Sequence, residues 1–223
     1  MQGLPATVVV AIDGPSGSGK STVARGVAAT LGLRYLDTGA MYRAITLLAL
    51  RRDVALDDAR ALTELAETVE LVLTSTPEPV RVSADGVDVT TAIRGEDVTA
   101  AVSAVSAVPG VRAAMVRRQR QTIGAGGIVV EGRDIGTTVA PDATVKIFLT
   151  ADETARATRR ARETAGALAP TREALSRRDR LDAGRAASPM AQAPDAVVVD
   201  SSHVSAADVI AQVVALVRSA ARA

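Results

Sequence analysis

The chain of 223 residues contains no cysteine, no tryptophan and no asparagine, and its one histidine is His203. Without cysteine there is no disulfide, no thiol nucleophile and no cysteine-ligated metal. One histidine is too few for a histidine-based zinc site, and we expect no chemical role for His203, which follows the last predicted strand in a turn. The lack of asparagine removes the guanine-binding Asn-Lys-x-Asp motif and the asparagine of a protein-kinase catalytic loop.

Aromatic residues are scarce, since Tyr35, Tyr42 and Phe148 are the only ones, but 48% of the chain is hydrophobic. The predicted core is therefore built from Val, Leu, Ile and Ala. A formal net charge of +1 argues against a nucleic-acid binder held by bulk charge. The N-terminal apolar run is too short for a signal peptide or a membrane span. We expect a cytoplasmic monomer with no nucleic-acid or membrane partner.

One stretch dominates the sequence: residues 14–21 read Gly-Pro-Ser-Gly-Ser-Gly-Lys-Ser, the G-x-x-x-x-G-K-[ST] pattern of a P-loop NTPase. A β-branched run precedes it and an Ala-rich helical stretch follows it, as this loop requires. Glycines let backbone N–H groups form an anion nest, and the helix N-terminus adds positive potential. Lys20 is expected at the β/γ-phosphates, and Ser21 is expected to ligate Mg²⁺. The residues predicted to bind ATP are Gly14, Pro15, Ser16, Gly17, Ser18, Gly19, Lys20, Ser21 and Thr22.

The order of apolar runs predicts an α/β fold: a P-loop NTPase sheet of five parallel strands flanked by helices. The strands are expected at residues 7–12, 34–36, 127–131, 145–149 and 196–199. Short β-branched segments at 70–74, 80–83 and 87–89, with a hairpin turn at 84–86, predict a small antiparallel insert. Two Arg-rich helices at 152–164 and 171–185, broken at 166–170, precede the last strand.

Lys20 and Lys146 are the only lysines among 26 basic residues. A GC-rich genome would explain this bias equally well, but arginines also stand in the loops where a P-loop enzyme would use them. Arginine binds phosphate bidentately, and phosphoryl transfer requires two anions held in line while their charge is neutralised. A nucleoside monophosphate, with a second phosphate pKa of about 6, is already a dianionic nucleophile. An alcohol acceptor would instead need a carboxylate base, for which Asp37 or Asp134 could serve.

Three further motifs resemble the signatures of bacterial cytidylate kinase. They are Asp-Thr-Gly-Ala-Met-Tyr-Arg at 37–43, Gly-Arg-Asp-Ile-Gly-Thr at 132–137, and Arg178-x-x-x-Asp182-x-x-Arg185. Residues 12–17 and 141–143 fit the same pattern, and the resemblance extends from about 9 to 217. It implies ATP- and Mg²⁺-dependent phosphorylation of CMP or dCMP. It also implies one domain with a core (about 1–37, 107–150 and 190–223), a CMP-binding lobe with the β insert (about 38–106) and a short helical lid (about 156–178).

The same resemblance implies roles for single residues. Arg43, Arg133 and Arg185 would hold the acceptor phosphate, and Arg178 and Asp182 would reach the sugar. The remaining members of the implied CMP site are Thr38 and the base-reading Ser103, Arg112 and Asp134. The catalytic set would be Lys20, Arg133, Arg185 and, on the first lid helix, Arg156 and Arg160.

Other interpretations stay open for several of these features. Residues 156–162 of the first lid helix could be a solvated face paired with Asp152, Glu153 and Glu163. The arginines at 117, 118 and 120 favour a structural role. The lid loop at 165–171 is shorter than is usual in the family, which leaves the phosphate contacts of the lid arginines open. The acceptor could be UMP, AMP or an alcohol, or the protein could be a nucleotide-dependent switch or a nucleic-acid-associated ATPase.

Overall fold

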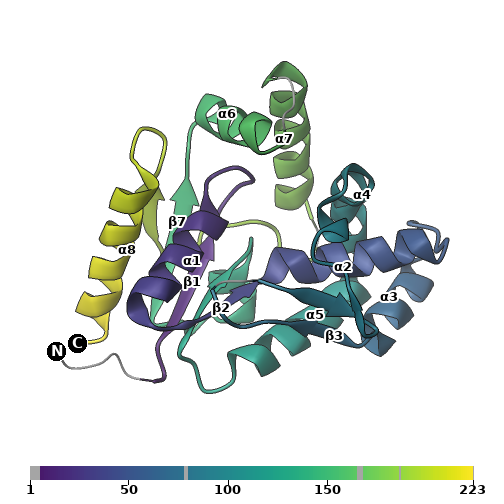
Figure 1. The fold of residues 1–223 in the computed structure, drawn as a ribbon, viewed down its shortest axis with the longest axis horizontal. Helices are drawn as coiled ribbons and strands as arrows, with labels where there is room; N and C mark the ends of the chain where they lie inside the picture. Colours follow the sequence, from purple (N-terminus) through teal and green to yellow (C-terminus); the bar gives the residue numbers. More distant parts are fainter. Residues whose placement is uncertain (1–5, 78–79, 165–167, 186, 223) are drawn as a thin grey trace.

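A parallel sheet of five strands forms the centre of the protein (Figure 1). The computed structural model describes residues 6–77, 80–164, 168–185 and 187–222. The strand order is β2-β6-β1-β7-β8, and every pairing is parallel. The strands are β1 (Val9–Asp13), β2 (Arg34–Asp37), β6 (Ile128–Glu131), β7 (Val145–Thr150) and β8 (Val197–Asp200). The predicted fold class and strands are thereby confirmed.

Helices cover both faces of this sheet, which is why its strands read as nearly continuous β-branched runs. On one face α1 (Lys20–Leu31) and α8 (Ala206–Ala220) pack side by side over β1, β6 and β7. On the other face lie α2 (Thr38–Arg51), α3 (Ala59–Thr68), α4 (Glu96–Ala107) and α5 (Pro109–Ile123). The core is mostly aliphatic, as its composition predicted.

The register of the strands gathers polar residues at one edge of the sheet. Ile12 pairs with Glu131, and Asp37 pairs with the same Glu131 from the other side. Asp13, Asp37 and Glu131 therefore end their strands at the same level. Carboxyl ends of parallel strands are where open α/β sheets bind ligands.

The predicted antiparallel insert is confirmed as a three-stranded sheet, β3 (Leu71–Leu73), β4 (Val82–Ala84) and β5 (Val87–Asp88). Asp85 and Gly86 join β4 to β5 with φ values of 49° and 76°, as a tight hairpin requires. Val82 and Ala84 point into the core shared with α2. A 3₁₀ turn, η1 (Ala92–Arg94), leads from the insert to α4.

The segment predicted as the lid falls within α6 (Glu153–Thr164) and α7 (Leu168–Ala183), drawn in green above the sheet in Figure 1. The break predicted at 166–170 is partly wrong. Residues 165–167 lie outside the described residues, but 168–170 already belong to α7. The proline at 170 is tolerated there because the first N–H groups of a helix have no intrahelical partner. Helix α7 also ends two residues before the predicted 185.

No single helix within the described ranges is long and apolar enough to cross a bilayer. The pair α4 and α5, bent by 94°, passes the same test together on length and composition alone.

Candidate functional site: a phosphate loop facing an arginine-lined cavity

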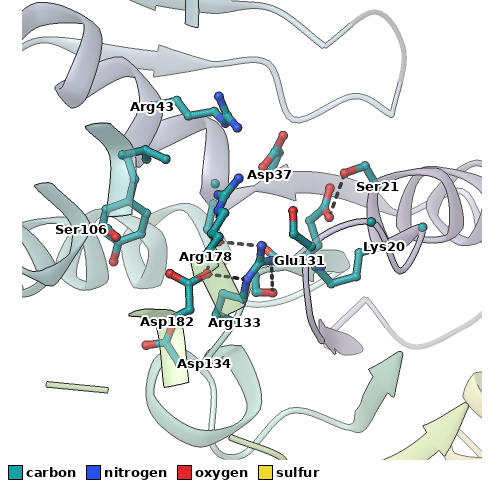
Figure 2. A pocket seen from close by; sticks show the side chains of 18 of the residues that line it. Lys20, Ser21, Asp37, Arg43, Ser106, Glu131, Arg133, Asp134, Arg178 and Asp182 are labelled. Atoms are coloured by element: carbon teal, nitrogen blue, oxygen red, sulfur yellow. Dashed lines mark hydrogen bonds and ion pairs between the residues drawn. The ribbon is translucent and has the colours of Figure 1, made fainter. Parts of the chain in front are cut away.

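A cavity of about 610 Å³ opens where β1, β2 and β6 end. Figure 2 shows Lys20 and Ser21 on one side of it, Ser106 on the other, and Arg43, Arg133 and Arg178 between them. The predicted residues that line the cavity are Ser16, Gly17, Gly19, Lys20, Ser21, Thr22, Thr38, Arg43, Arg112, Arg133, Asp134, Arg160, Arg178, Asp182 and Arg185. Residues predicted to bind ATP and residues predicted to bind CMP therefore line the same cavity.

The phosphate loop has the backbone geometry that its glycines predict. Gly17 and Gly19 have φ values of 77° and 89°, which favour glycine. A Cβ at Gly14 would lie 2.0 Å from the Leu149 carbonyl oxygen. Lys20 Nζ donates to the Pro15 carbonyl at 2.6 Å. Burial, and then the positive charge of Arg133, hold the Lys20 pKa well below its ordinary value, so an anion in the loop would be strongly favoured.

Glu131 is a site residue that sequence reasoning missed. Ser21 Oγ donates to Glu131 Oε2 at 3.0 Å, and the Tyr35 hydroxyl donates to Oε1. Burial, followed by the negative charge of Asp37, raises the Glu131 pKa to about 7. A carboxylate that ends an apolar strand directly before Gly132 was the signal available in the sequence.

Asp182 is the shared counter-ion of three arginines that line the cavity. Arg133 Nε lies 3.1 Å from its carboxylate, Arg185 Nη2 3.4 Å and Arg178 Nε 4.0 Å. The i, i+4, i+7 spacing predicted one face for residues 178, 182 and 185, and all three line the cavity. Burial is the main cause of the lowered Arg178 pKa, about 9, and mutual repulsion with Arg133 comes next.

Arg43 and Thr38 approach the cavity from α2. Arg43 Nη1 donates to the Ile93 carbonyl at 3.1 Å and to Thr99 Oγ1 at 2.9 Å. Burial lowers the pKa of Arg43 to about 10, with a further contribution from Arg160. Thr38 Oγ1 donates to the Glu131 carbonyl at 2.7 Å. These bonds fix the α2 side of the site.

Arg112 and Asp134 form a buried ion pair at the far end of the cavity. The Arg112 guanidinium lies 5.5 Å from the centre of the Tyr42 ring, so Tyr42 borders the site as well as the core. Ser103, predicted here, is not among the residues lining the cavity; Ser106, three residues later on α4, lines it. Ser106 Oγ donates to the Ser103 carbonyl at 3.2 Å.

Asp13 organises the loop that carries Arg133 and Asp134. Its two carboxylate oxygens accept the Ile135 and Gly136 N–H groups, each at 2.8 Å. These groups begin η2 (Ile135–Val139), a turn of π-helix. Asp13 therefore shapes the strand end and the loop facing it.

The lid arginines divide between two environments. Arg160 lines the cavity, whereas Arg156 Nη1 donates to the Ser16 carbonyl at 3.1 Å. Arg159 Nη1 donates to Ser201 Oγ at 3.0 Å. The solvated-face interpretation is therefore wrong for Arg156 and Arg159, which contact the phosphate loop or the loop after β8.

Arg117, Arg118 and Arg120 of α5, for which a structural role was expected, contact α3 and η2 and do not line the cavity. Arg117 pairs with Glu67 at 3.0 Å, and Arg120 Nη2 donates to the Thr138 carbonyl at 2.7 Å. His203 is 89% exposed and lies 3.6 Å from Asp152.

A phosphate loop that shares an arginine-lined cavity at the carboxyl ends of a five-stranded parallel sheet is the arrangement of a P-loop kinase. The cytidylate kinase family model matches residues 10–219, and the chain belongs to this family. It is 52% identical over 221 residues to a cytidylate kinase from Mycobacterium avium (strain 104), covering 96% of this chain and 97% of that one.

A second relative is a bifunctional pantoate ligase/cytidylate kinase from Synechococcus sp. (strain JA-2-3B'a(2-13)), 52% identical over 222 residues. The alignment covers 96% of this chain but only 41% of the bifunctional protein. Among solved structures, a gluconokinase from Sinorhizobium meliloti 1021 has a TM-score of 0.51 at 15% identity, covering 97% of this chain and 95% of that one. That likeness concerns the fold alone.

Proposed function

We propose that this protein transfers the γ-phosphoryl group of ATP to CMP or dCMP, giving ADP and CDP or dCDP. The observation that carries the proposal is the cavity that Lys20 shares with Arg43, Arg133, Arg178 and Arg185. Such a cavity holds two phosphate anions face to face. Membership in the cytidylate kinase family supports CMP as the acceptor.

The transfer needs no covalent enzyme intermediate and no protein base. An oxygen of the acceptor phosphate forms a bond to the γ-phosphorus, and the bond from that phosphorus to the β–γ bridging oxygen breaks, releasing ADP. Lys20 and the arginines neutralise the charge on the transferring group. The Arg133 and Arg185 guanidinium groups, already held by Asp182, lose little freedom when the acceptor phosphate binds.

The residues beside the phosphate loop fit Mg²⁺, which prefers oxygen ligands and keeps several waters. Ser21 offers a hydroxyl and Glu131 a carboxylate, 3.0 Å apart. Ser21 would hold the ion, and Glu131 would fix Ser21 and the surrounding waters. When bound, Mg²⁺ neutralises phosphate charge.

The Arg112–Asp134 pair would read the base. The carboxylate accepts from the exocyclic amine of cytosine, and the guanidinium donates to O2 and N3. Uracil lacks that amine and would leave a buried acceptor unpaired, which disfavours it. Ser106, rather than Ser103, lines this end of the cavity. Its hydroxyl is therefore our preferred partner for the hydrogen-bonding edge of the cytosine base. Asp182 and Arg178 would bind the sugar.

The test is a coupled assay of ADP release with CMP, dCMP, UMP, AMP and a panel of alcohols. We expect CMP and dCMP to stimulate release well above the rate without acceptor. Stimulation by another acceptor instead would indicate a different small P-loop kinase. Hydrolysis without any acceptor and with steep salt dependence would indicate a nucleic-acid-associated ATPase. No stimulation by CMP would reject the proposal.

A further inference from the structure

The lid holds the phosphate loop through the backbone of Ser16. Its N–H donates to Asp179 Oδ1 at 3.2 Å, and its carbonyl accepts from Arg156 Nη1 at 3.1 Å. Arg156 and Asp179 also form an ion pair with each other, and their side chains are only 12% and 16% exposed. A charge pair of the lid therefore binds both polar backbone groups of one loop residue.

The two members of this pair reach the loop in different ways. The backbone of Arg156 already packs on the loop, since a Cβ at Gly17 would lie 2.9 Å from the Arg156 carbonyl oxygen. Asp179 comes from α7, the second lid helix. Its neighbour Arg178 lines the acceptor cavity. Successive residues of α7 thus serve the donor loop and the acceptor site.

We propose that Asp179 is a positioning residue for the phosphoryl transfer proposed above, on which this inference rests. It orients the Arg156 guanidinium and holds Ser16 while the donor phosphates bind. A flexible arginine loses side-chain entropy when it is ordered, and a fixed carboxylate partner reduces that loss at the moment of binding. Arg156 in turn balances the Asp179 carboxylate, which would otherwise repel the phosphates.

The end of α7 that faces the proposed CMP site is held by a separate ion pair. Arg133, on the loop after β6, holds Asp182 at 3.1 Å. Loss of the Asp179 carboxylate should therefore affect the use of ATP while the use of CMP is largely retained. That split separates positioning of the donor loop from a general loosening of the lid.

Glu153 provides the matched control. Its carboxylate accepts from Arg172 Nη2 at 2.8 Å and from Ser176 Oγ, so it also links α6 to α7 by a charged contact. Among the described residues its hydrogen bonds go to Arg172 and Ser176 of α7, and none reaches the phosphate loop. Glu153→Gln removes one negative charge, as Asp179→Asn does.

The experiment measures kcat and both KM values for Asp179→Ala, Asp179→Asn, Arg156→Ala, the Arg156→Ala/Asp179→Ala double variant and Glu153→Gln. We expect Asp179→Ala to lower kcat about tenfold and raise KM for ATP at least about threefold, with KM for CMP within about twofold. The double variant should lose about as much as Arg156→Ala alone, because the pair acts as a unit. Asp179→Asn keeps an acceptor for the Ser16 N–H, so its losses in kcat and in KM for ATP should be smaller. It replaces Asp179→Ala as the test variant if that protein does not fold.

Affinity for a fluorescent ATP analogue without acceptor is measured in parallel. Asp179→Ala should weaken it at least about threefold, and Glu153→Gln should not. This readout is independent of CMP use, so failure of the proposed function and failure of this inference are distinguishable. Equal kinetics for Asp179→Ala and Glu153→Gln, or losses that multiply in the double variant, would overturn the inference.

Discussion

Replacement of Asp182 by asparagine tests whether its charge organises the arginine-lined cavity. Its carboxylate is 5% exposed and is the partner of Arg133, Arg178 and Arg185. An amide of nearly the same shape removes the negative charge and leaves three guanidinium groups without their common partner. We therefore expect the folded protein to lose stability before any substrate is added.

The structure sets the size of the effect. Removing one partner of a fully buried ion pair costs about 3–5 kcal/mol. The Arg133 and Arg178 side chains are 17% and 21% exposed, so water screens part of the repulsion, and we expect about 2–3 kcal/mol. For a protein of this length, this free-energy loss lowers Tm by about 4–12 °C.

The measurement is thermal unfolding with and without inorganic phosphate. A phosphate dianion supplies the missing negative charge, so it should raise the Tm of Asp182→Asn more than that of the unaltered protein. Asp195→Asn is the control, because Asp195 is 64% exposed where it pairs with Lys146, and its loss should leave the Tm nearly unchanged. If Asp182→Asn unfolds at the original temperature, or phosphate shifts both proteins equally, the charge argument is refuted.

Three further predictions follow from single residues. Lys20→Ala should lower kcat about a hundredfold or more with an unchanged circular dichroism spectrum, because Lys20 acts on developing charge; a loss below tenfold contradicts this. Burial raises the pKa of Asp13 to about 6 from 3.8, so the Asp13 carboxyl binds its proton more tightly in the folded protein than in the unfolded chain. The stability that this protonation contributes is therefore lost as pH rises from about 4 to 6. In urea unfolding, Asp13→Asn should therefore lose more stability relative to the unaltered protein at pH 4.5 than at pH 7; an equal or opposite difference refutes the sign. A Cβ at Gly26 would lie 2.3 Å from Ile210 Cδ1, so overpacking should cancel the roughly 1 kcal/mol that Gly→Ala gains inside a helix; the Gly26→Ala/Ile210→Val double variant should be more stable than the sum of the two single changes predicts, and simple additivity contradicts the clash.

The sheet was predictable because both faces of its central strands are buried. Runs such as the one ending at Ile12 must be apolar at every position, and only short strands between Gly-rich turns fit them. The phosphate loop was equally clear, since its glycines are required by backbone geometry. The insert followed from its short alternating strands and from the turn at Gly86.

The contacts that connect these elements were not predictable. Glu131 is one carboxylate at a strand end, and only the register with Asp37 and the approach of Ser21 give it a role. Asp179 lies next to Arg178 in a charged helix, where many carboxylates are solvated, and its partner Ser16 is 163 residues away. Whether a helix begins before or after a proline differs by a single turn, so the start of α7 was misplaced.

The bond from Ser21 to Glu131 has a consequence for the hydroxyl itself. A serine hydroxyl carries one hydrogen and two lone pairs, and here the hydrogen is directed at a carboxylate oxygen 3.0 Å away. This hydrogen bond fixes the torsion of the Ser21 hydroxyl. Its lone pairs then point away from Glu131 and are free for the proposed Mg²⁺. Tyr35, on the edge strand β2, donates to the other oxygen of the same carboxylate, so a buried tyrosine hydroxyl helps to orient the serine oxygen.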